Sequence, residues 1–228
     1  RLVGSEMCIR DRERIDNYAF SSCPYLKSVT ISEGVKEIGW AAFEKATLET
    51  VNIPSSVKRI ETYAFNECRE LKNVTILEGV NEIGYSAFAA TALETVYIPS
   101  SVKSIEEYAF CECRELKDVT ISEGVEHIGM LAFNNCQNIG DVQIPASVKK
   151  IDAYAFNLCW YWNEGTIKFI RKTDFEYDNS MLWNDNRVSI LIPIDAKENY
   201  TNYDGTIIFE HVSNDCLLYT SPSPRDGA

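Results

Sequence analysis

Residues 93–115 read LETVYIPSSVKSIEEYAFCECRE, and residues 26–161 consist of imperfect repeats of this stretch. Successive copies begin 22 or 23 residues apart, and they start at Leu26, Leu48, Leu71, Leu93, Leu116 and Ile139. Odd copies carry S-E-G-V or L-E-G-V where even copies carry P-S-S-V or P-A-S-V, so a longer period of 45 residues spans two copies. A fixed period in this range predicts a solenoid.

Each copy opens with the pattern L-x-x-V-x-I, for example at Leu48, Val51 and Ile53. Alternating β-branched residues indicate a short strand, which ends at Pro54 because proline has no N–H for a ladder. Ile60 and the Ala64-Phe65 pair then have the spacing of one face of a single helical or 3₁₀ turn. The predicted fold class is therefore an α/β repeat, a solenoid with one short strand and one short helical or 3₁₀ turn per copy.

The apolar positions predict one continuous interior. About seven of them recur in each copy, and one copy alone is too small to bury them, so stability has to come from stacking between neighbours. We expect one phenylalanine of each copy to form a buried column, composed of Phe43, Phe65, Phe88, Phe110, Phe133 and Phe156.

Five cysteines share one position in the repeat, three residues after the phenylalanine: Cys23, Cys68, Cys113, Cys136 and Cys159. Other copies hold Ala46 or Thr91 there, which predicts a buried column of small side chains. A disulfide stays possible only between adjacent copies, Cys113 with Cys136 or Cys136 with Cys159. Because Cys111 and Cys113 have no second ligand pair, we predict neither a metal nor another cofactor.

The two ends of the chain do not match the repeat. One codon choice for residues 216–226 has a reverse complement that encodes LVGSEMCIRD, the sequence of residues 2–11. Two protein termini have no reason to be antisense translations of one DNA string, and that string resembles a sequencing adapter. We expect residues 1–12 and 216–228 to be translated library DNA, with both natural termini missing.

Between these ends, residues 13–161 form the predicted solenoid, a half copy plus six full copies. Residues 162–215 are expected to be degenerate repeats that form a C-terminal cap, because a solenoid has to cover its last exposed face. Strands are expected at residues 165–170, 188–194 and 205–210, with a short helix after the second of them. Three tryptophans in this part are expected to plug the core or, alternatively, to form a ligand platform: Trp160, Trp162 and Trp183.

Composition argues against several functions. A net charge of −12 disfavours nucleic acid as a partner, since nucleic-acid binders carry basic patches. No apolar run is long enough to insert into a membrane. The chain carries no G-x-S-x-G, P-loop, H-E-x-x-H or C-x-x-C motif, and the carboxylates of Glu33, Glu78 and Glu123 fall at turns expected to be solvated. We expect His127 to be exposed and without a role, and we predict that the protein is not an enzyme.

The outward-facing strand residues predict a binding surface. They form a ribbon of small polar side chains with one aromatic residue, Tyr97, of a type common at interface hot spots. A second column of large residues before the Ala-Phe pairs, from Trp40 to Tyr154, is expected to pack against neighbouring copies, with surface recognition as the alternative. The predicted partner-binding residues of the ribbon are Thr30, Asn52, Thr75, Thr95, Tyr97, Asp118, Thr120, Asp141 and Gln143.

The pattern L-x-x-V-x-I-P-x-S-V-x-x-I-x-x-x-A-F-x-x-C resembles the BspA-like branch of the leucine-rich repeats over about two-thirds of the chain. The slot of the leucine-rich-repeat asparagine holds Gly or Ser here, for example Gly34 and Ser56, so no asparagine ladder is expected. The resemblance implies a secreted or cell-surface protein that binds host matrix proteins, other cell surfaces or glycans, with adhesion as its role. The alternative is a structural spacer or regulatory repeat region of a larger multidomain protein or enzyme.

Overall fold

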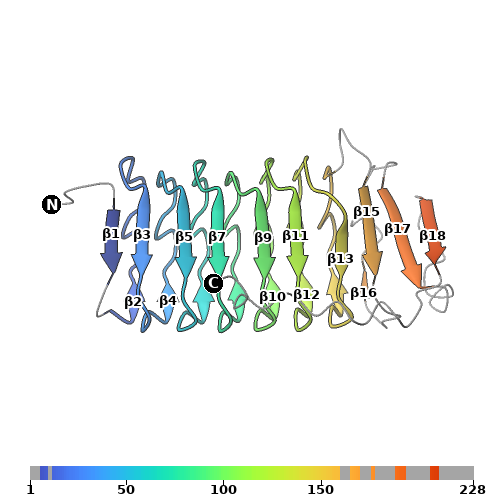
Figure 1. The fold of residues 1–228 in the computed structure, drawn as a ribbon, viewed down its shortest axis with the longest axis horizontal. Coiled ribbons are helices and arrows are strands. Elements are labelled where there is room, and N and C mark those ends of the chain that lie inside the picture. Colours follow the sequence, from blue (N-terminus) through green and yellow to red (C-terminus); the bar gives the residue numbers. More distant parts are fainter. Residues whose placement is uncertain are drawn as a thin grey trace, which may run out of the picture.

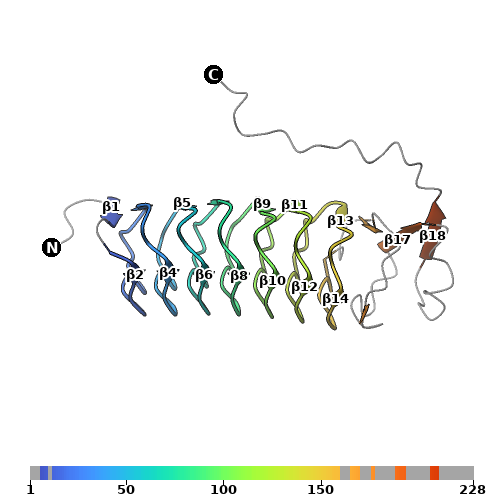
Figure 2. The same ribbon diagram turned by 90° about the horizontal axis from the view of Figure 1, so that it is seen from below.

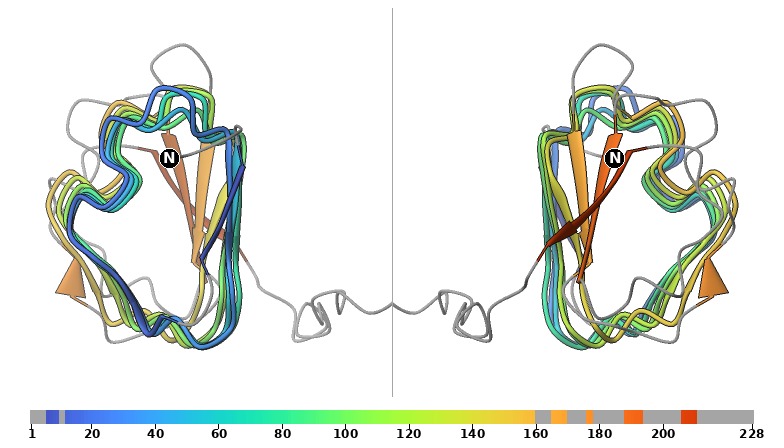
Figure 3. Two further views of the ribbon diagram at one scale, coloured as in Figure 1. Left: turned by 90° about the vertical axis from the view of Figure 1, so that its left-hand side faces the viewer. Right: turned by 90° about the vertical axis from the view of Figure 1, so that its right-hand side faces the viewer.

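The protein is a β-solenoid of about seven turns, seen from the side in Figure 1. The computed structural model describes residues 6–9, 12–159, 165–169, 176–177, 188–193 and 206–210. Every turn follows the same closed path, so the successive copies superimpose when viewed along the axis (Figure 3). The repeat in the sequence therefore becomes a repeat in space, in which each copy contacts its neighbours.

The first strand of each copy lies where the L-x-x-V-x-I pattern predicts it. These strands lie side by side, and most pair in parallel and in register, with Val51 beside Val29 on one side and Val74 on the other. Their valines and isoleucines face the interior while the alternate residues face solvent. The strands of this first ladder are β1 (Glu6–Ile9), β3 (Ser28–Ile31), β5 (Thr50–Ile53), β7 (Asn73–Ile76), β9 (Thr95–Ile98), β11 (Asp118–Ile121) and β13 (Val142–Ile144).

A second strand in each copy, absent from the prediction, forms at the V-x-x-I segment. Each of these strands has only two residues, yet together they build an eight-stranded parallel sheet. Figures 2 and 3 show this second ladder on the side of the solenoid away from the first. Its strands are β2 (Arg14–Ile15), β4 (Glu37–Ile38), β6 (Arg59–Ile60), β8 (Glu82–Ile83), β10 (Ser104–Ile105), β12 (His127–Ile128), β14 (Lys150–Ile151) and β16 (Glu176–Tyr177).

The helical or 3₁₀ turn expected around each Ala-Phe pair is not confirmed, because the described residues there form successive turns. Two residues per copy have positive φ, such as Tyr63 at 59° and Glu67 at 55°. These values lie in the left-handed region of backbone conformation, which a right-handed helix cannot contain without being interrupted. The N–H groups of Tyr63, Phe65 and Glu67 donate to carbonyls of the next copy at 2.8–2.9 Å. Backbone bonds between copies therefore replace those of a helix.

The predicted interior is confirmed. All six phenylalanines of the column are 0% exposed, and their rings stack between adjacent copies with centroids 5.1–5.4 Å apart. The cysteine column is also buried from Cys68 onward, while Cys23 is half-buried, and these thiols are free. Each buried thiol donates to a phenylalanine carbonyl, as Cys68 does to Phe43 at 2.9 Å. Burial raises the pKa of Cys68 to about 12, so the thiol stays protonated near neutral pH.

The chain ends extend the first ladder. Strand β1, which lies within the proposed adapter-encoded segment, pairs with β3 where the first strand of a preceding copy would lie. At the other end, β15 (Gly165–Phe169), β17 (Val188–Pro193) and β18 (Thr206–Glu210) continue the sheet in parallel from β13. The three tryptophans, the helix expected after Ile194 and residues 216–228 lie outside the described residues.

Candidate binding surface

The polar ribbon lies on the outer face of the first ladder. All nine predicted partner-binding residues, from Thr30 to Gln143, are exposed there. Strand register places Thr30, Asn52 and Thr75 in one row, and it places Thr120 beside Tyr97 in the next two strands along the ladder. Since neighbouring parallel strands lie about 4.8 Å apart, the row presents one side chain at each such interval. The ribbon is therefore continuous, as the sequence predicts, although its binding role stays a prediction.

Two apolar side chains stand out on this polar face. Tyr97 is 45% exposed, and Leu77, which the sequence analysis overlooked, is 44% exposed. Leu77 follows Thr75 by two residues, so the alternation of the strand directs it to the same face. The equivalent position holds proline or serine in the other copies, as at Pro54 and Ser122, and that departure from the repeat was the signal in the sequence.

A border of charges of both signs flanks the ribbon in the first five copies, at the residue that follows the leading leucine. Lys27 pairs with Glu49 at 3.0 Å, and Lys117 pairs with Glu94 at 3.5 Å. All four side chains are largely exposed, so these pairs contribute little to stability.

The turn carboxylates do more than meet solvent. The carboxylate of Glu78 accepts hydrogen bonds from the N–H groups of Ser100 at 3.1 Å and Ser101 at 2.9 Å, in the next copy. Ser101 completes the contact, since its hydroxyl donates to Val80 O and accepts from the N–H of Gly79. The carboxylates of Glu33 and Glu123, in the odd copies before and after, likewise accept hydrogen bonds from two backbone N–H groups in the turn of the following even copy. We call this arrangement the glutamate-turn contact.

The glutamate-turn contact shifts the acid–base equilibrium of its carboxylate. For Glu78, partial desolvation raises the pKa, but the hydrogen bonds from Ser100 and Ser101 outweigh it and hold the pKa below the usual range. The pKa of Glu33 is lowered by the same balance of desolvation against hydrogen bonds from Ser55 and Ser56. The ionised form is therefore the one that holds the adjacent turn.

The second column of large residues packs against its neighbours, as expected. Edge-to-face contacts run from Tyr18 through Trp40, Tyr63 and Tyr85 to Tyr108, with ring centroids 4.5–5.9 Å apart. Apart from Tyr18, these rings are partly buried. Such pairs stabilise the stacking of copies beyond the area that they bury.

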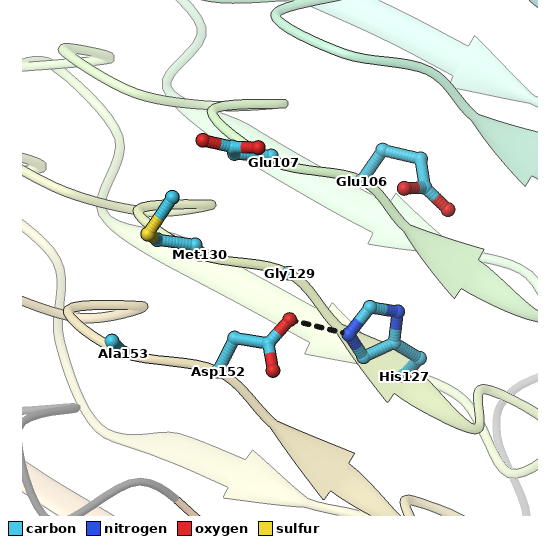
Figure 4. A pocket seen from close by; sticks show the side chains of 7 residues that line it. All are labelled: Glu106, Glu107, His127, Gly129, Met130, Asp152 and Ala153. Atoms are coloured by element: carbon cyan, nitrogen blue, oxygen red, sulfur yellow. Dashed lines mark hydrogen bonds and ion pairs between the residues drawn. The ribbon is translucent and has the colours of Figure 1, made fainter.

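His127 departs from its expectation of being exposed and without a role. Its side chain is 31% exposed, Nε2 lies 2.8 Å from Asp152 Oδ2, and Nδ1 lies 3.3 Å from Ser104 Oγ (Figure 4). Partial burial raises the pKa of Asp152, but hydrogen bonds from Lys150 and His127 together lower it below the usual range. His127 is thus part of a polar network between three copies, away from the ribbon.

The described part of the chain holds no group of three or more histidine, cysteine or acidic side chains arranged to bind a metal ion. Within the same residues, no helix has the length and hydrophobicity needed to cross a bilayer.

Comparisons with solved structures give three similar proteins. A leucine rich cell surface protein from Faecalibacterium prausnitzii A2-165 is 24% identical with a TM-score of 0.48, over 92% of this chain and 60% of that chain. A leucine-rich repeat protein from Bacteroides ovatus ATCC 8483 is 16% identical with a TM-score of 0.40, over 90% of this chain and 83% of its own. The pneumococcal vaccine antigen PcpA is 14% identical with a TM-score of 0.34, over 91% of this chain and 80% of that chain. The chain thus spans 60% of the length of the Faecalibacterium protein.

A search of curated protein sequences finds no match. A family profile does match: the one described as the BspA type leucine rich repeat region covers residues 9–113 and 87–184, with 6 copies. The matched residues include every complete copy from Leu26 onward and the two ladders that these copies build. The chain therefore belongs to the BspA-type leucine-rich repeat family.

Proposed function

We propose that this solenoid is a non-enzymatic recognition module of a cell-surface or secreted protein, and that it binds a protein or glycan partner through the ribbon. The observation that carries the proposal is the exposed face of the first ladder, which presents eight small polar or acidic residues together with the exposed Tyr97 and Leu77. Adhesion to host matrix or to other cells is the role that we assign to this binding.

The chemistry of the ribbon favours a broad, flat contact. Its threonine, asparagine and aspartate side chains are short, so ordering them on binding costs little conformational entropy. Their hydroxyl, amide and carboxylate groups offer both donors and acceptors at regular intervals. Tyr97 within the row and Leu77 just after the end of β7 add exposed apolar area, where a partner can exclude water and gain most of its binding free energy.

The ribbon also explains why we propose binding without catalysis. Its residues lie on a regular sheet face exposed to solvent, whereas general acid–base chemistry requires groups whose pKa values are shifted by a cleft. The strongest pKa changes in the described residues belong instead to buried cysteines of the core. Protein or glycan binding uses the ribbon as the fold presents it.

The test is a triple variant, Tyr97→Ala with Thr120→Ala and Asp141→Ala, measured for binding to cultured cells and to a panel of immobilised matrix proteins. Because these residues share one face, we expect at least about a tenfold loss of affinity for the partner that the parent binds. The matched control replaces three exposed residues off the ribbon by alanine: Glu70, Asn81 and Glu115.

Equal binding by the triple variant and the parent would overturn the ribbon proposal. It would favour the second candidate, a spacer or regulatory repeat region in a larger protein, which needs no conserved chemistry on its outer face. Binding lost only in the triple variant, with both variants as stable as the parent, would support recognition through the ribbon.

A further inference from the structure

A column of charge pairs follows the second ladder and repeats every two copies. Arg14 pairs with Glu37 of the next copy at 3.2 Å, and Arg59 pairs with Glu82 at 3.0 Å. Arg59 also reaches Glu61, two residues further along its own copy, at 3.3 Å. In the second copy, one cation thus serves a carboxylate of the same copy and another of the next copy.

The fourth copy interrupts this column. Ser104 stands where the other even copies have Arg14, Arg59 or Lys150, and His127 replaces the glutamate of the next copy. The carboxylate of Glu106 accepts a hydrogen bond from Ser104. Among the described residues, no lysine or arginine pairs with Glu106 or with Glu107 beside it. Two half-buried carboxylates are therefore left without the cation that Glu61 has in the second copy.

A pocket of about 300 Å³ opens at this interruption, lined by Glu106, Glu107, His127, Gly129, Met130, Asp152 and Ala153. Figure 4 shows the carboxylates placed around Gly129, with Met130 and Ala153 on one side of it. A Cβ at Gly129 would lie 2.7 Å from the backbone N of Glu107, so only glycine fits, and the backbones of the fourth and fifth copies approach closely at the floor of the pocket.

The charges in the pocket are unequally compensated. Asp152 is held by Lys150 at 2.8 Å and by His127 at 2.8 Å, so this carboxylate already has its partners. Glu106 and Glu107 line the same pocket with their carboxylates well separated (Figure 4), and no described lysine or arginine pairs with either of them. The pocket consequently offers two carboxylates to a donor that comes from outside, beside an apolar wall made by Met130 and Ala153.

We infer that this pocket binds a cationic side chain, the arginine of a protein partner. A guanidinium group carries five donors in a planar fork that matches carboxylates, and charge-assisted hydrogen bonds are the strong ones. The methylene stem of arginine packs on apolar surface such as Met130 and Ala153 while its head reaches the carboxylates. The bound arginine takes the place that Arg59 fills in the second copy. This site lies on the second ladder, so the inference stands independently of the ribbon.

The probe is Nα-acetylarginine amide, titrated into the intact protein and followed by the amide NMR signals of Gly129 and Met130. Nα-acetylcitrulline amide, which has the same shape without the charge, is the control ligand. Ser104→Arg restores the cation of the repeat from within the chain, so this variant is expected to fold and to lose at least about tenfold in affinity. Glu106→Gln, which keeps the side-chain shape, is expected to show a similar loss.

Glu61→Gln is the matched control, because Glu61 occupies the equivalent position and already has Arg59 as its partner. It is expected to leave the affinity within about twofold of the parent. Three results would overturn the inference: citrulline binding as well as arginine, Ser104→Arg binding like the parent, or Glu61→Gln weakening binding as much as Glu106→Gln. The last result would mean that the probe responds to general surface charge.

Discussion

The phenylalanine of each copy is the residue on which the stacking of the solenoid depends most. Phe110 is 0% exposed and lies between Phe88 and Phe133, with ring centroids 5.4 and 5.3 Å away and both pairs 5° from parallel. Each ring thus fills part of the interior of its own copy and also packs against the rings of both neighbouring copies. Removing one ring leaves a cavity that affects three copies at once.

We predict that Phe110→Ala lowers the free energy of unfolding by about 3–5 kcal/mol, because of lost burial and the cavity that remains. Urea unfolding followed by circular dichroism measures the change. Tyr97→Ala is the control, since this ring is exposed, and we expect it to change stability by less than about 0.5 kcal/mol. A loss below about 1 kcal/mol for Phe110→Ala would contradict the view that the column stabilises the stack.

At the scale of the turn, the alternation of odd and even copies has a structural cause. Within a pair, the carboxylate of the odd copy holds the turn of the following even copy, as Glu78 does with Ser100. Between pairs, a glycine of the odd copy closely approaches the turn of the preceding even copy: a Cβ on Gly124 would lie 2.2 Å from Ser100 O. The glutamate and glycine of the S-E-G motif thus contact the P-S-S turns of the following and the preceding even copy, and this pattern repeats every 45 residues.

We predict that Gly124→Ala destabilises the protein by more than about 2 kcal/mol, because its φ of 115° and the contact with Ser100 both exclude a side chain. Gly140→Ala is the matched control, since its Cβ would lie 3.3 Å from Lys117 O and no left-handed φ is required there. We expect less than about 1 kcal/mol for this control. Thermal unfolding of both variants decides the point, and equal losses would show that the close approach has no special importance.

At the scale of the whole molecule, the carboxylate contacts make stability depend on pH. Glu33, Glu78 and Asp152 all have pKa values lowered in the folded protein, chiefly by hydrogen bonds that outweigh desolvation. A carboxyl group with a lowered folded pKa stabilises the fold above its unfolded pKa, and this contribution is lost as the pH falls through the folded value. Because two of these groups belong to a repeated contact, several junctions weaken over the same pH range.

We therefore expect constant stability between about pH 7 and pH 5 and a decline below about pH 4.5, the ordinary range of glutamate. Glu78→Gln should reduce the difference in unfolding free energy between pH 7 and pH 3, by less than about 1 kcal/mol because the contact is exposed to solvent. Glu70→Gln is the control, an exposed carboxylate with no hydrogen bond to a described side chain. The pH-dependent role of the contact is wrong if Glu78→Gln keeps the full dependence of the parent.

Much of the fold could be predicted from the sequence because the repeat applies the same local rule six times. Period-two alternation at Val51 and Ile53 places the first strand, and it also places outward residues such as Thr75 and Tyr97 on one exposed face. A phenylalanine and a cysteine at constant positions predict the buried columns, since only stacking can cover them. These features follow from residue type and spacing alone.

The remaining features depend on contacts between copies, which no single copy encodes. A two-residue strand such as Arg59–Ile60 is too short to recognise by periodicity and exists only because its neighbours pair with it. The expected helical turn is not confirmed because Tyr63 and Glu67 bond to the next copy in left-handed backbone. The role of Glu78 and the pocket beside Ser104 became visible only in three dimensions. The repeat period thus determined the solenoid and its exposed ribbon, whereas the stacking of one copy on the next decided the second ladder, the turns and the pocket, because those depend on groups 21 or more residues apart.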